Sequence, residues 1–252
     1  MTVLLLCLAG PLQAWGSAAR FVRRTTENAP TKSGVLGLLA AAQGRPRTAD
    51  LSDLAALRFG VRVDQPGTRV RDFHKAQHAE SGKVMPLSYR FYLADAVFVA
   101  GVEGPEKLIR QLHHALETPY FLPYLGRRSC PPARPLLFEG SLTDGPLEDA
   151  LRATPWQASP WYARQLARAG AGVHGEGRPQ PEQLDLLLDC PADETPDFSL
   201  RDTPVAFDPR HRQYTMRGVR IGHVNAPAHD PTAHLRRAAP SGPPGPSSPY
   251  AP

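Results

Sequence analysis

The eight residues from Thr2 to Ala9, TVLLLCLA, constrain the fold more than any other segment. Only Thr2 in this run is polar, and Gly10 and Pro11 end it. An apolar run of this length predicts a central β-strand that is buried on both faces. No stretch of the chain reaches the roughly 20 apolar residues of a membrane span. A secretion signal is the alternative interpretation of the run, although no positively charged segment precedes it.

A buried helix is predicted over residues 33–43. Pro30 limits its start, Ser33 or Thr31 can cap it, and Gly44 suits the left-handed position after its end. Apolar residues occupy almost every side of this segment, so the helix should have little exposed surface.

The start of this helix combines Lys32, Ser33 and Gly34. The first turn of a helix carries unpaired N–H groups and a partial positive charge, so these residues could bind a phosphate. The order K-S-G differs from the GxxxxGK[ST] motif of nucleotide-binding loops, which argues against ATP or GTP hydrolysis. The structural alternative is that Ser33 only caps the helix, Lys32 is solvated and Gly34 allows close packing.

The following segments predict an α+β chain. Residues 59–65 alternate apolar and polar residues as a half-buried strand does, and helical spacing begins after Gly104 and Pro105. The further predicted elements are a short helix at 51–58, strand character at 90–104 and a strand at 136–140. The resulting βαββαβ order is that of a ferredoxin-like (RRM-like) domain, which we place at residues 1–142.

Three segments are expected to differ from this domain. Residues 67–91 are charged, rich in turn formers and without a sustained period, so they should protrude as a thumb hairpin. Residues 143–225 should form a smaller strand-rich C-terminal lobe, with a helix at 147–152, a strand at 184–188 and a hairpin in QYTMRGVRIGHV. The Pro/Ser-rich tail at 226–252 should be disordered.

Charge and cysteine content limit the function classes. Lysine and arginine outnumber aspartate and glutamate 29 to 24, which gives a net charge of +5 and an isoelectric point near 9.3. An acidic partner is therefore plausible. The three cysteines form no CxxC pair, which predicts neither a disulfide framework nor a zinc site, and no metal or cofactor is expected. A reducing cytoplasm is the expected location.

The arginines gather in short local groups rather than in one basic tail. The groups are Arg20, Arg23 and Arg24, then Arg45 and Arg47, then Arg127 and Arg128. This distribution favours several separate anion contacts.

The segment PYFLPYLGRRSCPP, residues 119–132, suits single-stranded RNA. Its prolines exclude regular structure, and Arg127 and Arg128 lie near Tyr120, Phe121 and Tyr124, which could stack on unpaired bases. The alternative is a connecting loop with inward-facing rings and solvated arginines.

Catalytic candidates are few. His74 and His78 lie with Lys75 in the protruding segment, and a metal-independent ribonuclease can use such groups with the RNA's own 2′-hydroxyl. Asp95 and Glu103 have no matched carboxylate partner, which argues against a two-metal nuclease centre.

Five blocks in order resemble the fifth Cas protein family of the RAMP superfamily, and within it the CasD subunits of type I-E CRISPR Cascade complexes. They are GPLQAWG (10–16), PTKSGVLGLLAAAQG (30–44), RDFH (71–74), YLADAVF (92–98) and YLGRRSCPP (124–132). The match extends to roughly residue 155. The resemblance implies an antiviral surveillance complex, in which such a protein binds the five-prime handle of a CRISPR RNA through an RRM-like fold.

The resemblance also implies partners and a non-enzymatic role. The protein would contact the backbone subunit and the large subunit, meet target DNA only indirectly, and bind without cutting. No membrane contact is expected. The alternative is a metal-independent endoribonuclease that processes precursor CRISPR RNA.

The resemblance and the arginine groups together assign RNA contacts. Lys32, Ser33 and Gly34 fall in the family's helix-start motif, and Arg127 and Arg128 fall in its GRRSCP loop. The family has a thumb over residues 72–92 that wedges into the guide. The complete set of expected RNA-binding residues is Arg20, Arg23, Arg24, Lys32, Ser33, Gly34, Lys75, Met85, Arg90, Tyr124, Arg127 and Arg128.

The chain departs from the family's pattern in two places. Cys7 stands where many relatives are expected to have arginine, which removes one RNA contact. The aromatic signature of an ordinary RRM is missing, so base stacking on the sheet face is not assumed. Some type I-C relatives cut precursor RNA, but their cutting residues have no matching positions here.

Overall fold

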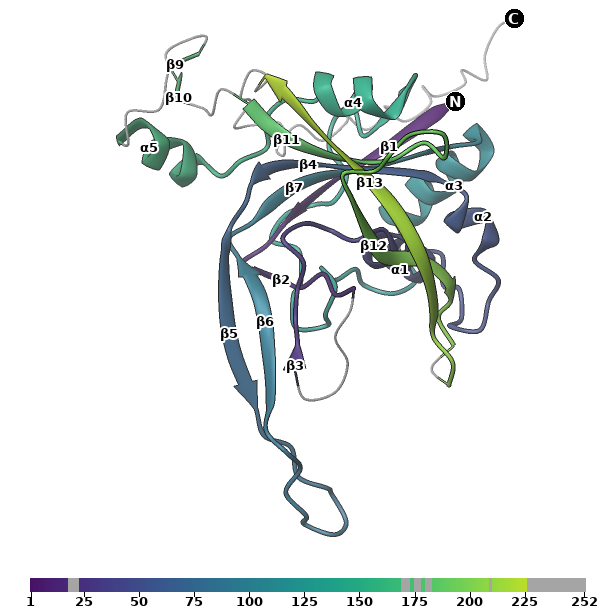
Figure 1. Ribbon diagram of the computed structural model, residues 1–252, viewed down its shortest axis with the longest axis vertical. Helices are drawn as coiled ribbons and strands as arrows, with labels where there is room; N and C mark the ends of the chain where they lie inside the picture. Colours follow the sequence, from purple (N-terminus) through teal and green to yellow (C-terminus); the bar gives the residue numbers. More distant parts are fainter. Residues whose placement is uncertain (18–22, 169–172, 175–177, 180–182, 209, 226–252) are drawn as a thin grey trace, which may run out of the picture.

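The computed structural model describes residues 1–17, 23–168, 173–174, 178–179, 183–208 and 210–225. Within this part, the chain is a mixed α/β structure built on an antiparallel sheet with the strand order β12-β13-β11-β4-β7-β1-β8 (Figure 1). Its strands are β1 (Thr2–Ala9), β4 (Arg58–Gln65), β7 (Val97–Gly104), β8 (Leu142–Asp144), β11 (Gln183–Asp189), β12 (Phe198–Ala206) and β13 (Gln213–Asn225).

The remaining elements cover or extend this sheet. The helices are α1 (Lys32–Ala42), α2 (Ser52–Ala55), α3 (Glu106–Glu117), α4 (Leu147–Ala153) and α5 (Pro160–Arg168). A second sheet contains β2 (Leu12–Gln13), β3 (Arg23–Arg24), β5 (Thr68–His74) and β6 (Ser88–Ala94), and β9 (Val173–His174) pairs with β10 (Arg178–Pro179). No helix in the described ranges has the length and apolar character that a membrane crossing requires.

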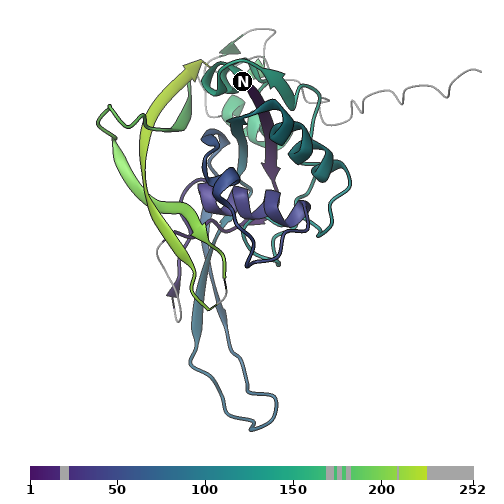
Figure 2. The same cartoon turned by 90° about the vertical axis from the view of Figure 1, so that its right-hand side faces the viewer.

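The prediction that β1 is buried on both faces is confirmed. Leu4, Leu6 and Leu8 pack in the cluster that includes residues of α1 and α3, whereas Val3 and Leu5 pack against α4 on the opposite face. Figure 2 shows α1, α2 and α3 together on one side of the sheet. An apolar strand with helices on both faces explains why nearly every residue of this run is hydrophobic.

The helix predicted at 33–43 is also confirmed, with its start one residue earlier. Thr31 is the N-cap, and its Oγ1 accepts a hydrogen bond of 3.3 Å from the N–H of Gly34. The cap satisfies one of the unpaired N–H groups in the first turn.

The predicted half-buried pattern of β4 is wrong, although the strand itself is present. Arg62 and Asp64 are almost completely buried, and their side chains form a hydrogen-bonded ion pair with an Nε–Oδ1 distance of 2.7 Å. The Arg62 guanidinium also donates to the carbonyl oxygens of Leu151, Thr154 and Pro155. Because α4 and the segment after it cover this face, the polar residues of β4 are paired inside the protein instead of with water.

The strand predicted at 136–140 is displaced. Residues 136–140 are irregular, and the last strand of this region is β8, which pairs with the start of β1. The prolines at 131, 132 and 135 lack an N–H group, and Gly140 turns the chain with a φ of 83°. Regular pairing therefore begins only after this turn.

The C-terminal strands extend the same sheet, because β11 pairs with β4. The predicted hairpin in QYTMRGVRIGHV is wrong: this segment lies in the single strand β13, which pairs with β12 over its first half and with β11 over its second half. Because β13 pairs with a different strand over each half of its length, the chain continues as one strand and forms no turn within this segment. The predicted boundary at residues 142 and 143 stays a prediction, and the tail at 226–252 lies outside the described residues.

A long hairpin formed by β5 and β6 extends away from the main sheet (Figure 1). The two strands are antiparallel, with Thr68 opposite Ala94 and His74 opposite Ser88. β6 also pairs with β2 at its base end, through Leu93 and Ala94, and in parallel with β3 near its start, through Tyr89 and Arg90. The hairpin is therefore joined to the N-terminal part of the chain.

Candidate nucleic-acid interface

One face of the hairpin base alternates rings and guanidinium groups. The strand register places Arg71 opposite Phe91 and Phe73 opposite Tyr89. The Arg71 guanidinium lies 5.5 Å from the centroid of the Tyr89 ring, and Arg23 on β3 lies 5.3 Å from that of Phe91. Phe73 is 62% exposed and Tyr89 is 37% exposed. Exposed rings next to cations can stack on unpaired bases while the cations bind phosphates.

The opposite face of the hairpin base carries three arginines. Arg24 lies beside Arg90 in the β3–β6 pair, and the Arg127 guanidinium lies 4.6 Å from the centroid of the Tyr92 ring. Arg90 Nε and Arg127 Nη1 are buried and have no hydrogen-bond partner among the described residues. A buried donor without an acceptor lowers the stability of the folded protein, and a phosphate oxygen of a bound nucleic acid would provide the missing acceptor. We call Arg23, Arg24, Arg71, Arg90 and Arg127 the hairpin-base cluster.

The loop that carries Arg127 and Arg128 is held by backbone bonds. The N–H of Leu125 donates to the carbonyl of Cys130 at 2.7 Å, and the N–H of Ala14 donates to the carbonyl of Leu125 at 3.1 Å. Gly126 has a φ of 83°, and a Cβ at this position would lie 1.8 Å from the Ala14 carbonyl oxygen. Only glycine fits there, so the sequence LGRR fixes the direction in which the loop presents Arg127.

The start of α1 already binds an anion from the same chain. The backbone N–H of Lys32 donates to Asp202 Oδ2 at 2.8 Å, and Lys32 Nζ lies 2.9 Å from Asp189 Oδ2. Both carboxylates also pair with Arg217, whose guanidinium binds Asp202 through two hydrogen bonds of 2.8 Å. Lys32 is 6% exposed. RNA contact by Lys32, Ser33 and Gly34 stays a prediction, and the observed geometry gives the first of these a structural role.

The helix-start motif and the GRRSCP loop both lie against the buried ring of Trp15. A Cβ placed on Gly34 would lie 2.8 Å from Trp15 Cε3, and one on Gly126 would lie 3.6 Å from the same atom. The helix-start motif and the GRRSCP loop are therefore neighbours in space. They present different groups, because the Lys32 ammonium pairs with Asp189 whereas Arg127 lies over Tyr92.

The other predicted contacts are spread along the hairpin and the loop. Arg128 is exposed and Tyr124 is half-buried. Lys75 is exposed beyond the end of β5, and Met85 is 48% exposed in the connecting segment, where its N–H donates to the carbonyl of Ala76. Arg20 lies outside the described residues.

Sequence analysis missed Arg71, Phe73 and Tyr89. The signal was present in TRVRDFH, where Arg69, Arg71 and Phe73 recur at every second position and so share one face of a strand. Treating residues 67–91 as a segment without a period concealed this pattern.

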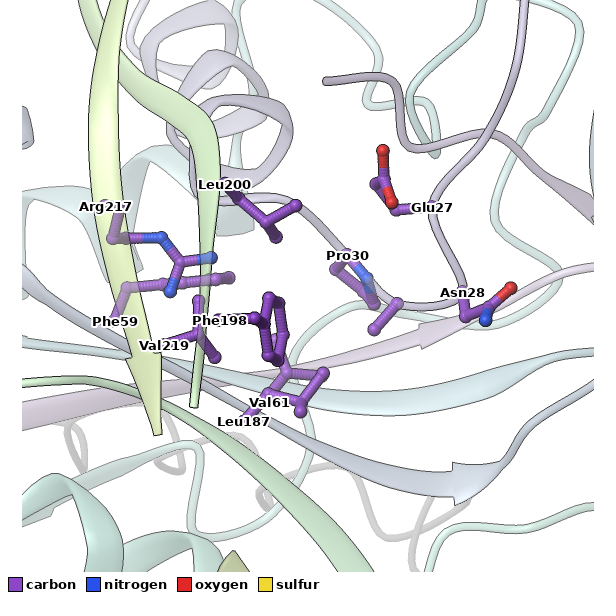
Figure 3. A pocket seen from close by; sticks show the side chains of 11 residues that line it. Glu27, Asn28, Pro30, Phe59, Val61, Leu187, Phe198, Leu200, Arg217 and Val219 are labelled. Atoms are coloured by element: carbon purple, nitrogen blue, oxygen red, sulfur yellow. The ribbon is translucent and has the colours of Figure 1, made fainter. Parts of the chain in front are cut away.

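A pocket of about 180 Å³ lies between the sheet and the segment before α1 (Figure 3). Its wall is mainly apolar, with Phe59, Val61 and Phe198 facing the cavity. The Arg217 guanidinium at its side lies 5.3 Å from the Phe59 ring and is bound to Asp202. Because that charge is already neutralised, the pocket is unsuited to a phosphate.

The groups considered for catalysis are mostly engaged in structure. Glu103 is buried and accepts from the N–H of Leu147 at 2.9 Å, and Asp95 occupies the turn between β6 and β7 with a φ of 56°. His74 Nε2 lies 2.8 Å from Asp72 Oδ2 on the hairpin. Among the residues that the structure describes, no group of three or more His, Cys, Asp or Glu side chains could hold a metal ion.

Known proteins share both the sequence and the fold. A family model described as "CRISPR-associated protein (Cas_Cas5)" matches residues 3–220. A curated relative from Escherichia coli (strain K12), "CRISPR system Cascade subunit CasD", is 36% identical over 173 residues, which are 60% of this chain and 77% of the relative.

Two solved structures are similar over most of the chain. One, described as "Crystal structure of Cas protein", has a TM-score of 0.68 and 37% identity and covers 91% of this chain and 99% of its own. The other, described as "CRISPR RNA-guided surveillance complex", has a TM-score of 0.70 and 32% identity, with coverages of 90% and 91%.

Proposed function

This chain belongs to the Cas5 family of CRISPR-associated proteins, and we propose that it binds the five-prime handle of CRISPR RNA as a subunit of a Cascade surveillance complex. The family resemblance predicted from the five sequence blocks is confirmed. The protein partners would be the backbone subunit and the large subunit, and target DNA would be met through the guide. The cytoplasm is the proposed location, as the three free cysteines suggest.

The hairpin-base cluster is the proposed RNA site. The observation that carries this assignment is that Arg24, Arg90 and Arg127 gather on one face of β3 and β6 while two of their buried donor atoms have no partner in the described structure. Phosphates would take these donors, and the Phe73 and Tyr89 rings on the other face would stack on bases. Lys75, Met85 and Arg128 would extend the contact along the hairpin and the loop.

The finer fold description is part of this proposal. The elements β1, α1, β4, β7, α3 and β8 follow the βαββαβ order, and the sheet order β4-β7-β1-β8 is compatible with a ferredoxin-like unit. The β5–β6 hairpin would then be the thumb inserted between the second and third strands of that unit. Its length and exposure support a role in reaching along the guide.

We propose a binding role rather than an enzymatic one. The specific observation in favour of the alternative is the pair of Asp72 and His74, which could orient an imidazole as a general base without a metal. Incubating the purified full-length protein with precursor CRISPR RNA in EDTA tests the alternative directly. We expect no cut at a defined position, and a cut abolished by His74→Ala would replace the binding-only proposal.

Handle affinity tests the proposed site. Fluorescence anisotropy with labelled handle RNA over a range of KCl concentrations should show weaker binding by Arg127→Ala with Arg128→Ala. The salt slope should fall by about 0.7 for each phosphate that the variant no longer neutralises. Arg201→Ala with Arg210→Ala removes the same charge from two exposed positions, in β12 and in the connection after it, and is the matched control. Equal affinity and slope in the two double variants would overturn the assignment.

A further inference from the structure

Helix α5 presents a basic, aromatic face that the proposed handle site does not use. Tyr162, Ala163 and Leu166 pack inward against the cluster that contains Trp156. Trp161, Arg164, Gln165 and Arg168 recur at positions i, i+3, i+4 and i+7, and all four are exposed. They form one continuous outer stripe, because these spacings share one side of a helix.

The stripe borders a hollow. Trp161, Arg164, Gln165 and Arg168 line an open hollow of about 410 Å³. Trp161 is 43% exposed, although a ring of this size is normally well covered in a folded protein. Its ring meets Tyr162 edge to face, with the centroids 5.9 Å apart. That neighbour orients the indole while leaving much of it open to solvent.

The charged residues near the α5 stripe in the sequence are all basic. Residues 150–175 contain no aspartate or glutamate, so the local sequence offers no carboxylate to neutralise Arg164 and Arg168. The ion pairs formed within the described part of the chain include neither of these two arginines. This differs from Lys32 and Arg62, whose charges are paired inside the protein.

We propose that the α5 stripe is a second nucleic-acid contact, which binds a single strand by stacking an unpaired base on Trp161 while Arg164 and Arg168 bind phosphates. Arg164 and Arg168 are one helical turn apart, about 6 Å along the axis, so they can reach neighbouring phosphates of one strand. Trp161 lies one turn before Arg164 and can take a base of the same strand.

This contact would be separate from the hairpin-base cluster. Figure 1 shows α5 at the left of the main sheet, whereas β3 and the hairpin strand β6 that it pairs with extend below the sheet. The proposal therefore goes beyond handle binding and does not depend on it. It implies that the subunit holds an unpaired segment of RNA or DNA at a second place on its surface.

Tryptophan fluorescence provides a readout specific to this site. Trp15 and Trp156 are fully buried, so a ligand that stacks on an exposed ring should quench the emission of Trp161 selectively. The experiment titrates the full-length protein with a short single-stranded DNA and a short single-stranded RNA that lack the handle sequence. Quenching by either one supports the proposal and identifies the strand type, and Trp161→Phe should remove most of it. A duplex of equal length should quench much less.

Affinity measurements on variants complete the test. Trp161→Ala should weaken single-strand binding at least about fivefold, the lower end for removal of one stacked base. Arg164→Gln with Arg168→Gln should lower the salt slope by about 1.4, corresponding to two phosphate contacts. Arg201→Gln with Arg210→Gln is the charge-matched control, and it should leave both the quenching of Trp161 and the salt slope unchanged.

Three outcomes would overturn the proposal. They are no quenching by either single strand, an unchanged slope in the Arg164 and Arg168 double variant, and equal quenching by polyglutamate of the same charge. The last result would assign the stripe to an acidic protein. Because the signal arises at Trp161, each of these outcomes leaves the handle-binding proposal intact.

Discussion

The guanidinium of Arg127 lies 4.6 Å from the centroid of the Tyr92 ring. Its Nη2 also donates to the carbonyl oxygen of Arg24 at 3.0 Å, while its Nη1 is buried without a partner in the described structure. The protein therefore fixes the position of the Arg127 guanidinium, while its Nη1 stays available to bind a ligand. The neighbouring Arg128 is exposed.

This difference predicts unequal roles for the two arginines. Arg127→Gln should weaken handle binding about tenfold and Arg128→Gln only about two- to threefold, because a pre-positioned side chain loses less entropy on binding. Each substitution should lower the salt slope by about 0.7. Anisotropy titrations of the two single variants measure both quantities. Equal reductions in affinity would show that the contact with Tyr92 does not prepare Arg127 for the ligand.

The pairing of Asp202 with the start of α1 predicts a stability effect. Asp202→Asn should reduce the free energy of unfolding by about 3 kcal/mol, because it leaves the buried guanidinium of Arg217 without its bidentate carboxylate. Urea unfolding measures this reduction, and Asp193→Asn at an exposed position is the control. Handle affinity of the folded variant should not change. A stable variant with reduced affinity would instead favour an RNA contact at the start of α1.

The buried pair of Arg62 and Asp64 should respond to removal of one partner more than to removal of both charges. Arg62→Met should destabilise the protein by about 3–5 kcal/mol, because it leaves a buried carboxylate unpaired. Adding Asp64→Asn should recover part of this stability, since the amide oxygen can still accept the N–H of Gln157. Urea unfolding of both variants decides the matter, and a double variant less stable than Arg62→Met would contradict this account.

Cys7 predicts an alkaline limit to stability. Burial raises the pKa of the Cys7 thiol from 9.0 to about 11, so the neutral thiol is favoured in the folded state. The corresponding stability is fully present below pH 9 and is lost as the pH rises through 11. At about pH 10.5 the decrease amounts to about 2 kcal/mol.

The comparison variant for this effect is Cys7→Ala. It should be less stable than the unsubstituted protein near about pH 8, because it leaves a cavity in β1, but its stability should fall by about 2 kcal/mol less between about pH 8 and 10.5. Urea unfolding at the two pH values measures the difference. Parallel decreases in the two proteins would show that Cys7 does not titrate in this range.

Local patterns were sufficient wherever one short segment carries its own information. The apolar run of β1, the helical spacing of α3 and the caps around α1 could each be recognised from neighbouring residues. The same holds for the family, because five blocks in order are specific without any knowledge of their arrangement.

Local patterns failed where a distant segment decides the environment. The alternation in β4 predicted solvent for Arg62 and Asp64, but α4 and the residues after it cover that face. The strand expected at 136–140 gave way to β8, because the residues before Gly140 make only isolated backbone bonds to β1, such as that from the N–H of Cys7 to the carbonyl of Leu136, and the regular ladder starts after the turn.

The amino-acid sequence by itself determined the family, the buried central strand and the arginines that are available for an anion. The tertiary structure alone decided which cations are left for a ligand. The Lys32 ammonium meets Asp189 across 157 positions of sequence and is neutralised, whereas Arg90 and Arg127 come together with donors to spare. The physical reason is that a charge is satisfied by whichever opposite group the folded chain brings within about 3 Å, and sequence spacing does not encode that distance.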